Sequence, residues 1–148
     1  MNLFQKLTSL TRRVVIVLGL VGMLAISFSA PAYAATPARF VLETPPASDQ
    51  FVIELTDESN IQQARNILNG TEKDQTHVIG RIIKTPAPYN SKWSYQLDPA
   101  SIRFFSFAIE VCDASIGYVE DHLDEAGGAF LPGLYWCPWS SRLVKEIQ

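Results

Sequence analysis

The residues of this chain that are best suited to catalysis lie close together, around a cysteine. Glu110 and Asp113 flank Cys112, and His122 follows them. Carboxylates and an imidazole are groups that general acid–base catalysis often uses, so one hypothesis is a small hydrolase-like enzyme built on Glu110, Asp113 and His122. Such carboxylates more often form structural ion pairs, and the sequence has no G-x-S-x-G, P-loop or H-E-x-x-H motif. We therefore expect no catalytic residues, no enzymatic activity and no cofactor.

Candidate metal ligands are equally sparse. His77 and His122 are the two histidines of the chain, and a metal site of the zinc type needs three or four ligands. One acidic group could bind calcium, but its spacing does not match the D-x-[DN]-x-[DN]-G loop. Its members are Glu120, Asp121, Asp124 and Glu125. We expect no metal site and a solvated acidic helix face.

The two cysteines have a clearer role. Cys112 and Cys137 are the only cysteines in the sequence. Two thiols in one small domain usually pair in an oxidising compartment, so we predict a disulfide between them. Two separate buried thiols are the alternative. A disulfide would also remove both sulfurs as nucleophiles.

The N-terminus predicts such a compartment. Residues 1–34 contain three basic residues and no acidic one, an apolar run over 14–28, and a final Ala-x-Ala. These are the parts of a secretory signal, so we expect cleavage between Ala34 and Ala35 and a secreted or periplasmic protein. The apolar run is shorter than the ~20 residues of a transmembrane helix. An uncleaved anchor is the alternative, and a pair of arginines also resembles a twin-arginine export signal.

The charge of the remaining chain excludes one class of partner. The whole sequence has 12 basic and 15 acidic residues. Loss of the three basic residues of the signal leaves 9 against 15, a net charge of −6. Because an acidic surface repels phosphate backbones and anionic lipids, we expect no nucleic-acid partner, and membrane contact only through an uncleaved signal. Roughly 114 residues suffice for one core, and we expect a monomer.

The elements that must position these residues follow from hydrophobic periodicity and turn signals. Residues 35–50 are rich in proline and small residues, so they are predicted to be a linker or flexible arm before a domain at 51–148, although Phe40 to Glu43 within them look strand-like. A helix is predicted to start at Thr56 or Asp57 and to end before Gly70. A second helix is predicted from an Asp113 cap to Gly127-Gly128. The predicted strands are 51–55, 77–84, 93–97, the second half of 102–112, and 142–147.

This order of elements predicts an α+β fold. We expect one antiparallel sheet of about four to five strands, with two helices packed on one face. The strand at 77–84 has apolar residues on both faces, which predicts an interior position in the sheet.

A longer pattern supports this assignment. The strings HVIGRIIKTPAPYNSKWSYQLDP, IEVCDAS, YVEDHL and GGAFLPGLYWCPWSSRLV resemble the family of the N-terminal domain of the slime-mould calmodulin-binding prespore protein. The resemblance covers about residues 51–147 and implies no catalytic residues. Calmodulin targets are typically basic amphipathic helices, whereas both predicted helices are neutral to acidic. We therefore do not expect the mature domain to bind calmodulin.

Aromatic residues are concentrated in two predicted loops. Tyr89 and Trp93 lie in one, and Trp136 and Trp139 in the other. Exposed aromatic clusters mark binding surfaces, so we predict a secreted binding module that recognises a protein, peptide or glycan through these four residues. The alternatives are that the rings pack on the core as loop anchors, and that the domain is a structural, envelope-associated module.

Overall fold

The computed structural model describes residues 36–46, 49–107 and 110–148, which belong to one compact unit. The predicted signal peptide and its cleavage point at Ala34 and Ala35 lie outside these residues. Within the described ranges, no helix has the length and apolar character needed to span a membrane.

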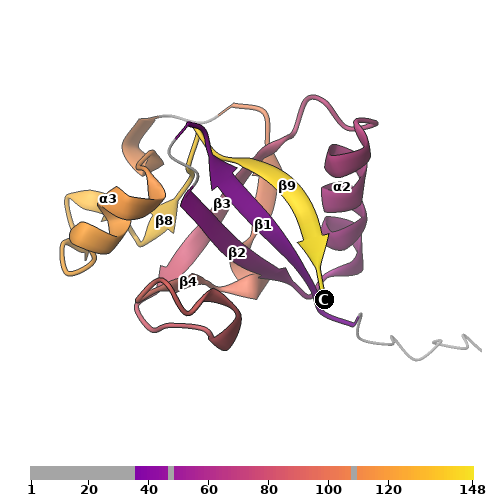
Figure 1. The fold of residues 1–148 in the computed structure, drawn as a ribbon. Helices are drawn as coiled ribbons and strands as arrows, with labels where there is room; N and C mark the ends of the chain where they lie inside the picture. The colour runs from indigo at the N-terminus through magenta and orange to yellow at the C-terminus, as the bar shows by residue number, and fades with distance from the viewer. Residues whose placement is uncertain (1–35, 47–48, 108–109) are drawn as a thin grey trace, which may run out of the picture. The chain divides into compact units, whose positions relative to one another are not determined.

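A three-stranded antiparallel sheet contains both ends of the described chain (Figure 1). Its order is β2 (Asp49–Leu55), β1 (Ala38–Thr44) and β9 (Arg142–Ile147), with β1 in the centre. The prediction of a linker over 35–50 is therefore wrong at 38–44. Phe40 and Leu42 are fully buried, and their burial outweighs the proline-rich composition of the segment. Strands were correctly predicted at 51–55 and 142–147.

A second antiparallel group of strands is built around β3 (His77–Ile83). This strand pairs with β4 (Gln96–Leu97), β5 (Arg103–Phe105) and β8 (Tyr135–Trp136), so its interior position is confirmed. The 3-10 turn η2 (Pro99–Ser101) separates β4 from β5. Its Ser101 hydroxyl accepts a hydrogen bond from the Arg81 N–H of β3 at 2.8 Å, which continues the pairing where the partner strand is interrupted.

The two groups of strands pack against each other, and β3 crosses behind β1 and β2 in Figure 1. Phe51 of β2 lies 5.1 Å from the Trp136 ring of β8 and 4.9 Å from the ring of Tyr95. Gly80 of β3 packs closely against the side chains of Leu97 and Ile102, which would have to shift slightly to admit a Cβ 3.0 Å from Leu97. The α+β class is confirmed, whereas the single sheet is replaced by two sheets that share one core.

The helices lie on opposite sides of these sheets, not on one face as predicted (Figure 1). Helix α2 (Glu58–Asn69) packs beside β9 and β5, and α3 (Ile116–Asp121) beside β2. The boundaries of α2 are as predicted: the Asp57 carboxylate accepts from the Asn60 N–H, and Gly70 ends the helix with φ of 79°. The cap of α3 is Ser115, not Asp113.

The prediction of a strand over the second half of 102–112 is wrong. The strand occupies Arg103–Phe105 instead, and Glu110–Cys112 forms the 3-10 turn η3. The register explains this difference, because Phe105 is paired with His77, the first residue of β3. Ser106 and Phe107 therefore have no partner on that strand. The remaining elements are η1 (Pro88–Asn90) and a parallel pair, β6 (Ala126–Gly127) and β7 (Phe130–Pro132).

Candidate functional site

The first predicted aromatic loop, around η1, faces the interior. Trp93 is buried, and its indole N–H donates to the backbone oxygen of Gln50 at 2.7 Å. Asn90 is buried beside it and accepts from the Val52 N–H at 3.0 Å. Gln50 and Val52 belong to β2, the edge strand of its sheet, and exposed edges can pair with other chains. The side chains of this loop thus cap the open edge of β2.

Tyr89 of the same loop is half-buried. Its hydroxyl donates to the Gln96 side chain at 3.2 Å, and the Arg39 guanidinium lies 4.8 Å from the centre of its ring. Burial raises the pKa of Tyr89. The residue therefore packs between neighbouring polar groups.

Trp136 is also an interior residue. Its ring is fully buried against Phe51 and Tyr95, and its indole N–H donates to the Ala114 backbone oxygen at 2.9 Å. Of the four residues predicted to bind a ligand, Trp93 and Trp136 serve as anchors of the core. This is the alternative that the sequence left open.

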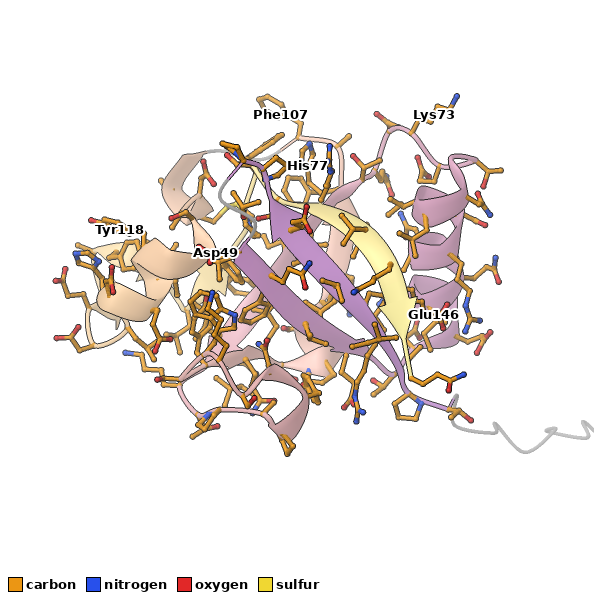
Figure 2. All side chains as sticks on the ribbon, viewed as in Figure 1. Asp49, Lys73, His77, Phe107, Tyr118 and Glu146 are labelled. Atoms are coloured by element: carbon orange, nitrogen blue, oxygen red, sulfur yellow. A yellow bond between two sulfur atoms is a disulfide. The ribbon has the colours of Figure 1, made fainter. Side chains whose placement is uncertain are left out.

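Trp139 is half-buried, like Tyr89, but it packs in a cluster of rings that reaches the surface. Its ring centre lies 4.3 Å from His77, 5.4 Å from Phe105 and 6.4 Å from Phe107. We call these four residues the Trp139 cluster. Phe107 is 82% exposed, and Figure 2 shows its ring projecting beyond the ribbon, near His77. The loop between β3 and β4 lies at the bottom of Figure 1, whereas His77 and Phe107 lie at the top of Figure 2, so the two aromatic loops lie apart.

The Trp139 cluster is held by residues that the sequence assigned to chemistry. The Asp113 carboxylate accepts from the Trp139 backbone N–H at 3.1 Å. The predicted pairing of Cys112 with Cys137 is present in the structure, and the Cys137 N–H also donates to the Cys112 oxygen. These contacts fix the backbone immediately before Trp139. The Nδ1 atom of His77 is buried without a hydrogen-bond partner among the described residues.

The remaining candidates for chemistry lie elsewhere or cannot be described. His122 follows α3, its Nδ1 lies 3.0 Å from the Tyr118 oxygen, and its ring stacks on Tyr118. The side chain of Glu110 lies outside the described part of the structure. Glu120 accepts from both the N–H and the hydroxyl of Ser94, so part of the predicted acidic face holds a loop. The described residues contain no group of three potential metal ligands.

A second open surface continues from the Trp139 cluster along β3. The odd-numbered residues of β3 face away from the core, while Val78, Gly80 and Ile82 are buried. Ile79 is opposite Arg103 of β5, and Arg81 is opposite Tyr135 of β8. We call Ile79, Arg81, Arg103 and Tyr135 the outer strip. His77 and Phe105 form the next pair on the same face, so the strip and the cluster are continuous.

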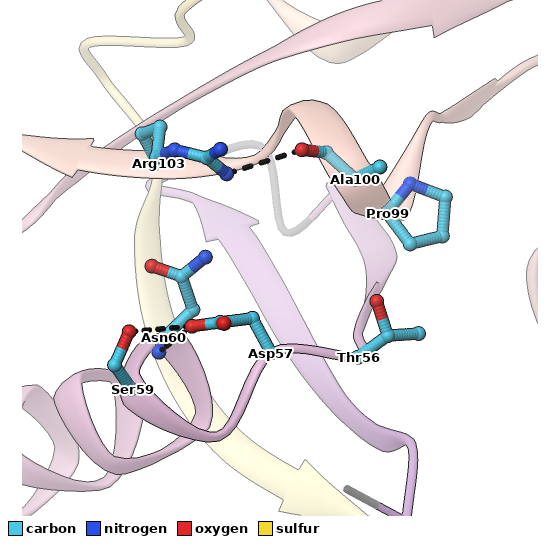
Figure 3. Close-up of a pocket in the computed structure, with 7 residues that line it drawn as sticks. All are labelled: Thr56, Asp57, Ser59, Asn60, Pro99, Ala100 and Arg103. Carbon is cyan, nitrogen blue, oxygen red and sulfur yellow. Dashed lines mark hydrogen bonds between the residues drawn. The ribbon is translucent and has the colours of Figure 1, made fainter. Parts of the chain in front are cut away.

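The outer strip borders two shallow pockets that share Ala100 and Arg103. One, of about 410 Å³, also includes Arg81 and Tyr135. The other, of about 530 Å³, lies between η2 and the start of α2. Figure 3 shows Arg103 and Ala100 on one wall of this second pocket and the first residues of α2 on the other.

Of the charged side chains that line these two pockets, all but one are engaged in an ion pair or a helix cap. Arg81 donates to the Asp98 carboxylate at 2.8 Å, and this hydrogen bond lowers the pKa of Asp98. The Asp57 carboxylate is used by the helix cap. Arg103 donates through Nη1 to the backbone oxygens of Ala100 and Ile102, at 3.2 and 2.6 Å, and pairs with no carboxylate of the described chain. One fixed cation is therefore left open to solvent.

Sequence reasoning did not find Phe105, Phe107 or the outer strip. For the β3 part of the strip, the available signal was the two-residue period of HVIGRIIK, which puts His77, Ile79 and Arg81 on one face. The apolar character of both faces concealed it.

The comparisons with known proteins agree with the resemblance noted in the sequence. The family model of the N-terminal domain of the calmodulin-binding prespore protein matches residues 36–148. The chain belongs to this family. The match begins before β1, which agrees with the position of β1 inside the folded domain. A search of curated proteins and a search of solved structures each gave no significant match.

Proposed function

We propose that this domain is a monomeric, non-enzymatic binding module that holds a protein, peptide or glycan through the Trp139 cluster. The observation that carries the proposal is the 82% exposure of Phe107 beside the rings of Trp139 and Phe105. Large apolar side chains gathered at a surface are typical of sites that a partner covers.

The rigidity of the cluster also supports binding. Asp113 fixes the Trp139 backbone, the disulfide fixes Cys137, and Phe105 is held in the ladder with β3. Side chains that are ordered before binding lose less conformational entropy when a partner arrives. Only Phe107 remains largely free of this framework.

The absence of catalysis is part of the same proposal. The Asp113 carboxylate accepts from a backbone N–H, and the His122 ring stacks on Tyr118. These two residues thus have structural roles, which favours binding over a hydrolase-like activity.

The proposed location is outside the cytoplasm. A disulfide in the domain is typical of secreted and periplasmic proteins, and the N-terminal sequence has the parts of a cleavable signal. Calmodulin is not the proposed partner. Calmodulin typically binds a basic amphipathic helix, whereas helix α2 packs against β9. Its Arg65 is already paired with Glu146 at 2.7 Å, and this pair lowers the pKa of the Glu146 carboxyl group.

The test compares capture of partners from the culture medium and the cell-surface fraction by four immobilised proteins. These are the wild type, Trp139→Ala, Phe107→Ser and the control Tyr118→Ala. Tyr118 is 50% exposed but lies on α3, outside the cluster. We expect the first two variants to lose partners that the wild type and the control retain. Equal recovery by all four proteins would remove the proposal.

A further inference from the structure

The Trp139 cluster and the outer strip form one surface with two different chemical characters. Pairing along β3 places His77 opposite Phe105, then Ile79 opposite Arg103, then Arg81 opposite Tyr135, all on the outer face. The first pair carries the rings that contact Trp139. The second carries a cation. An apolar region is thus followed, two residues further along the strand, by a positive charge.

Arg103 is the residue of this surface that forms no salt bridge with a described carboxylate, although its charge adds to the hydrogen bonds that lower the pKa of Asp57, which lines the same pocket. Its Nη1 is held by the oxygens of Ala100 and Ile102, and no described residue accepts a hydrogen bond from its Nε or Nη2. The neighbouring carboxylates are already engaged, Asp98 with Arg81 and Asp57 with the start of α2. A planar guanidinium with free donors fits a carboxylate better than other groups of a peptide.

The distance between the two regions matches the repeat of an extended peptide. Two residues of a strand span about 6.7 Å, and side chains two apart in an extended chain point to the same side. A peptide lying along the outer face can therefore place one side chain on the Trp139 rings and the side chain two residues further along at Arg103. The aromatic rings alone could also accept a sugar, but a neutral glycan has no carboxylate to pair with Arg103, which favours a peptide at this surface.

We propose that this surface binds an extended peptide that presents an apolar side chain to the Trp139 cluster and, two residues away, a carboxylate to Arg103. This inference rests on the proposed function, since it names the ligand class of the same cluster. On a domain whose net charge is acidic, a cation beside the apolar cluster favours peptides that carry their carboxylate at this position, because the net charge of the domain disfavours anionic peptides in general.

The test titrates the full chain with two peptides and follows the backbone amide signals by NMR. The peptides are acetyl-Leu-Ser-Asp-amide and acetyl-Leu-Ser-Asn-amide, which differ only in the carboxylate. We expect the Asp peptide to bind about tenfold more tightly, as is usual for a hydrogen bond to a charged group, and to shift the amides of Ile79 and Arg103. A third peptide, acetyl-Leu-Ser-Gly with a free C-terminus, shows whether a terminal carboxylate serves as well as a side chain.

Variants assign the preference to one residue. Arg103→Gln should bind both peptides equally, whereas Arg142→Gln, an exposed arginine on β9, should keep the preference. Equal binding of the two peptides by the wild type overturns the inference, and so does a preference that persists in Arg103→Gln. Absence of any shift at about 10 mM peptide, well above the ~1 mM dissociation constant of a weak complex, also overturns it.

The same titration separates this inference from the proposed function. If Trp139→Ala weakens both peptides while the wild type shows no preference for the carboxylate, the cluster binds and the role of Arg103 is wrong. If Trp139→Ala binds as the wild type does, the proposed function itself fails.

Discussion

Two aromatic regions of this domain have similar compositions and opposite roles. The η1 loop turns Trp93 inward, and its side chains close the open edge of β2. The Trp139 cluster turns Phe107 outward, to 82% exposure. Each region is rich in aromatic residues next to proline, so composition does not separate them.

The difference depends on the neighbouring backbone. The indole N–H of Trp93 has an acceptor on the edge strand β2, because the sheet ends there and Gln50 has a free oxygen. At the other region, β3 begins at His77, so Phe105 is the last residue of β5 that pairs with it, and Phe107 beyond this pair is exposed. An aromatic residue is buried as an anchor where its ring can cover the edge of a sheet and its N–H finds a backbone acceptor, as Trp93 does. It stays at the surface where the paired strand has ended, as Phe107 does.

The strongest test of this contrast is Trp93→Ala. We expect the free energy of unfolding to fall by about 3–5 kcal/mol, because a large ring is removed from a buried site. Urea denaturation measures the loss. Trp93→Phe separates the ring from its N–H, and should recover more than half of the loss. A cost for Trp93→Ala that is no larger than that of Trp139→Ala would contradict the contrast.

Removal of the disulfide tests the opposite region. The paired substitution Cys112→Ser with Cys137→Ser opens a link between residues 25 apart in the sequence. We expect a loss of about 3 kcal/mol from the greater entropy of the unfolded chain, measured by thermal unfolding. The amide signals near Trp139 should change and those of the η1 loop should not. Changes of equal size in both regions would show that the two regions are not independent.

Asn90→Ala tests the role of the η1 loop at the strand edge. The Val52 N–H would lose its acceptor, at a cost of about 1–2 kcal/mol. The exposed edge should also increase self-association, measured by sedimentation at rising protein concentration. Ser91→Ala, in the same loop but exposed, is the matched control. If the variant stays as soluble and stable as this control, the loop does not protect the edge.

Asp98→Asn tests the charges of the outer strip. The folded-state pKa of Asp98 is lowered chiefly by its hydrogen bond with Arg81, so its stabilising effect is complete above its unfolded pKa and is lost as the pH falls through the folded value. We expect the variant to be less stable than the wild type by about 1 kcal/mol at pH 7 and equally stable near about pH 2. Urea denaturation across this range gives the difference, which should not persist in acid.

Phe107→Ser has the smallest expected effect on stability. Its ring is largely exposed, so the free energy of unfolding should change by no more than about 0.5 kcal/mol. Phe104→Ser, whose ring is buried on the other face of β5, should cost more than about 2 kcal/mol. Similar costs for the two variants would mean that Phe107 belongs to the core and offers no binding surface.

The local elements of this fold were predictable where the signal is short-range. The cap at Asp57, the glycine at Gly70 and the strands at 51–55, 77–84 and 142–147 depend on neighbours in the sequence. The linker prediction failed at 38–44, where a proline-free stretch between Pro37 and Pro45 forms the central strand β1. It also failed after Phe105, where the length of β3 decides how far the pairing extends. Pairing between distant segments has no local signature.

The sequence by itself determined the α+β class, the family, and the pair of cysteines able to join. These depend on residue types and periods that can be observed along the chain. Only the tertiary structure decided which aromatic rings are anchors and which are surface, and that Arg103 stands unpaired beside them. The physical reason is that burial and pairing are properties of neighbours in space, and β3 brings residues 77–81, 103–105 and 135 together.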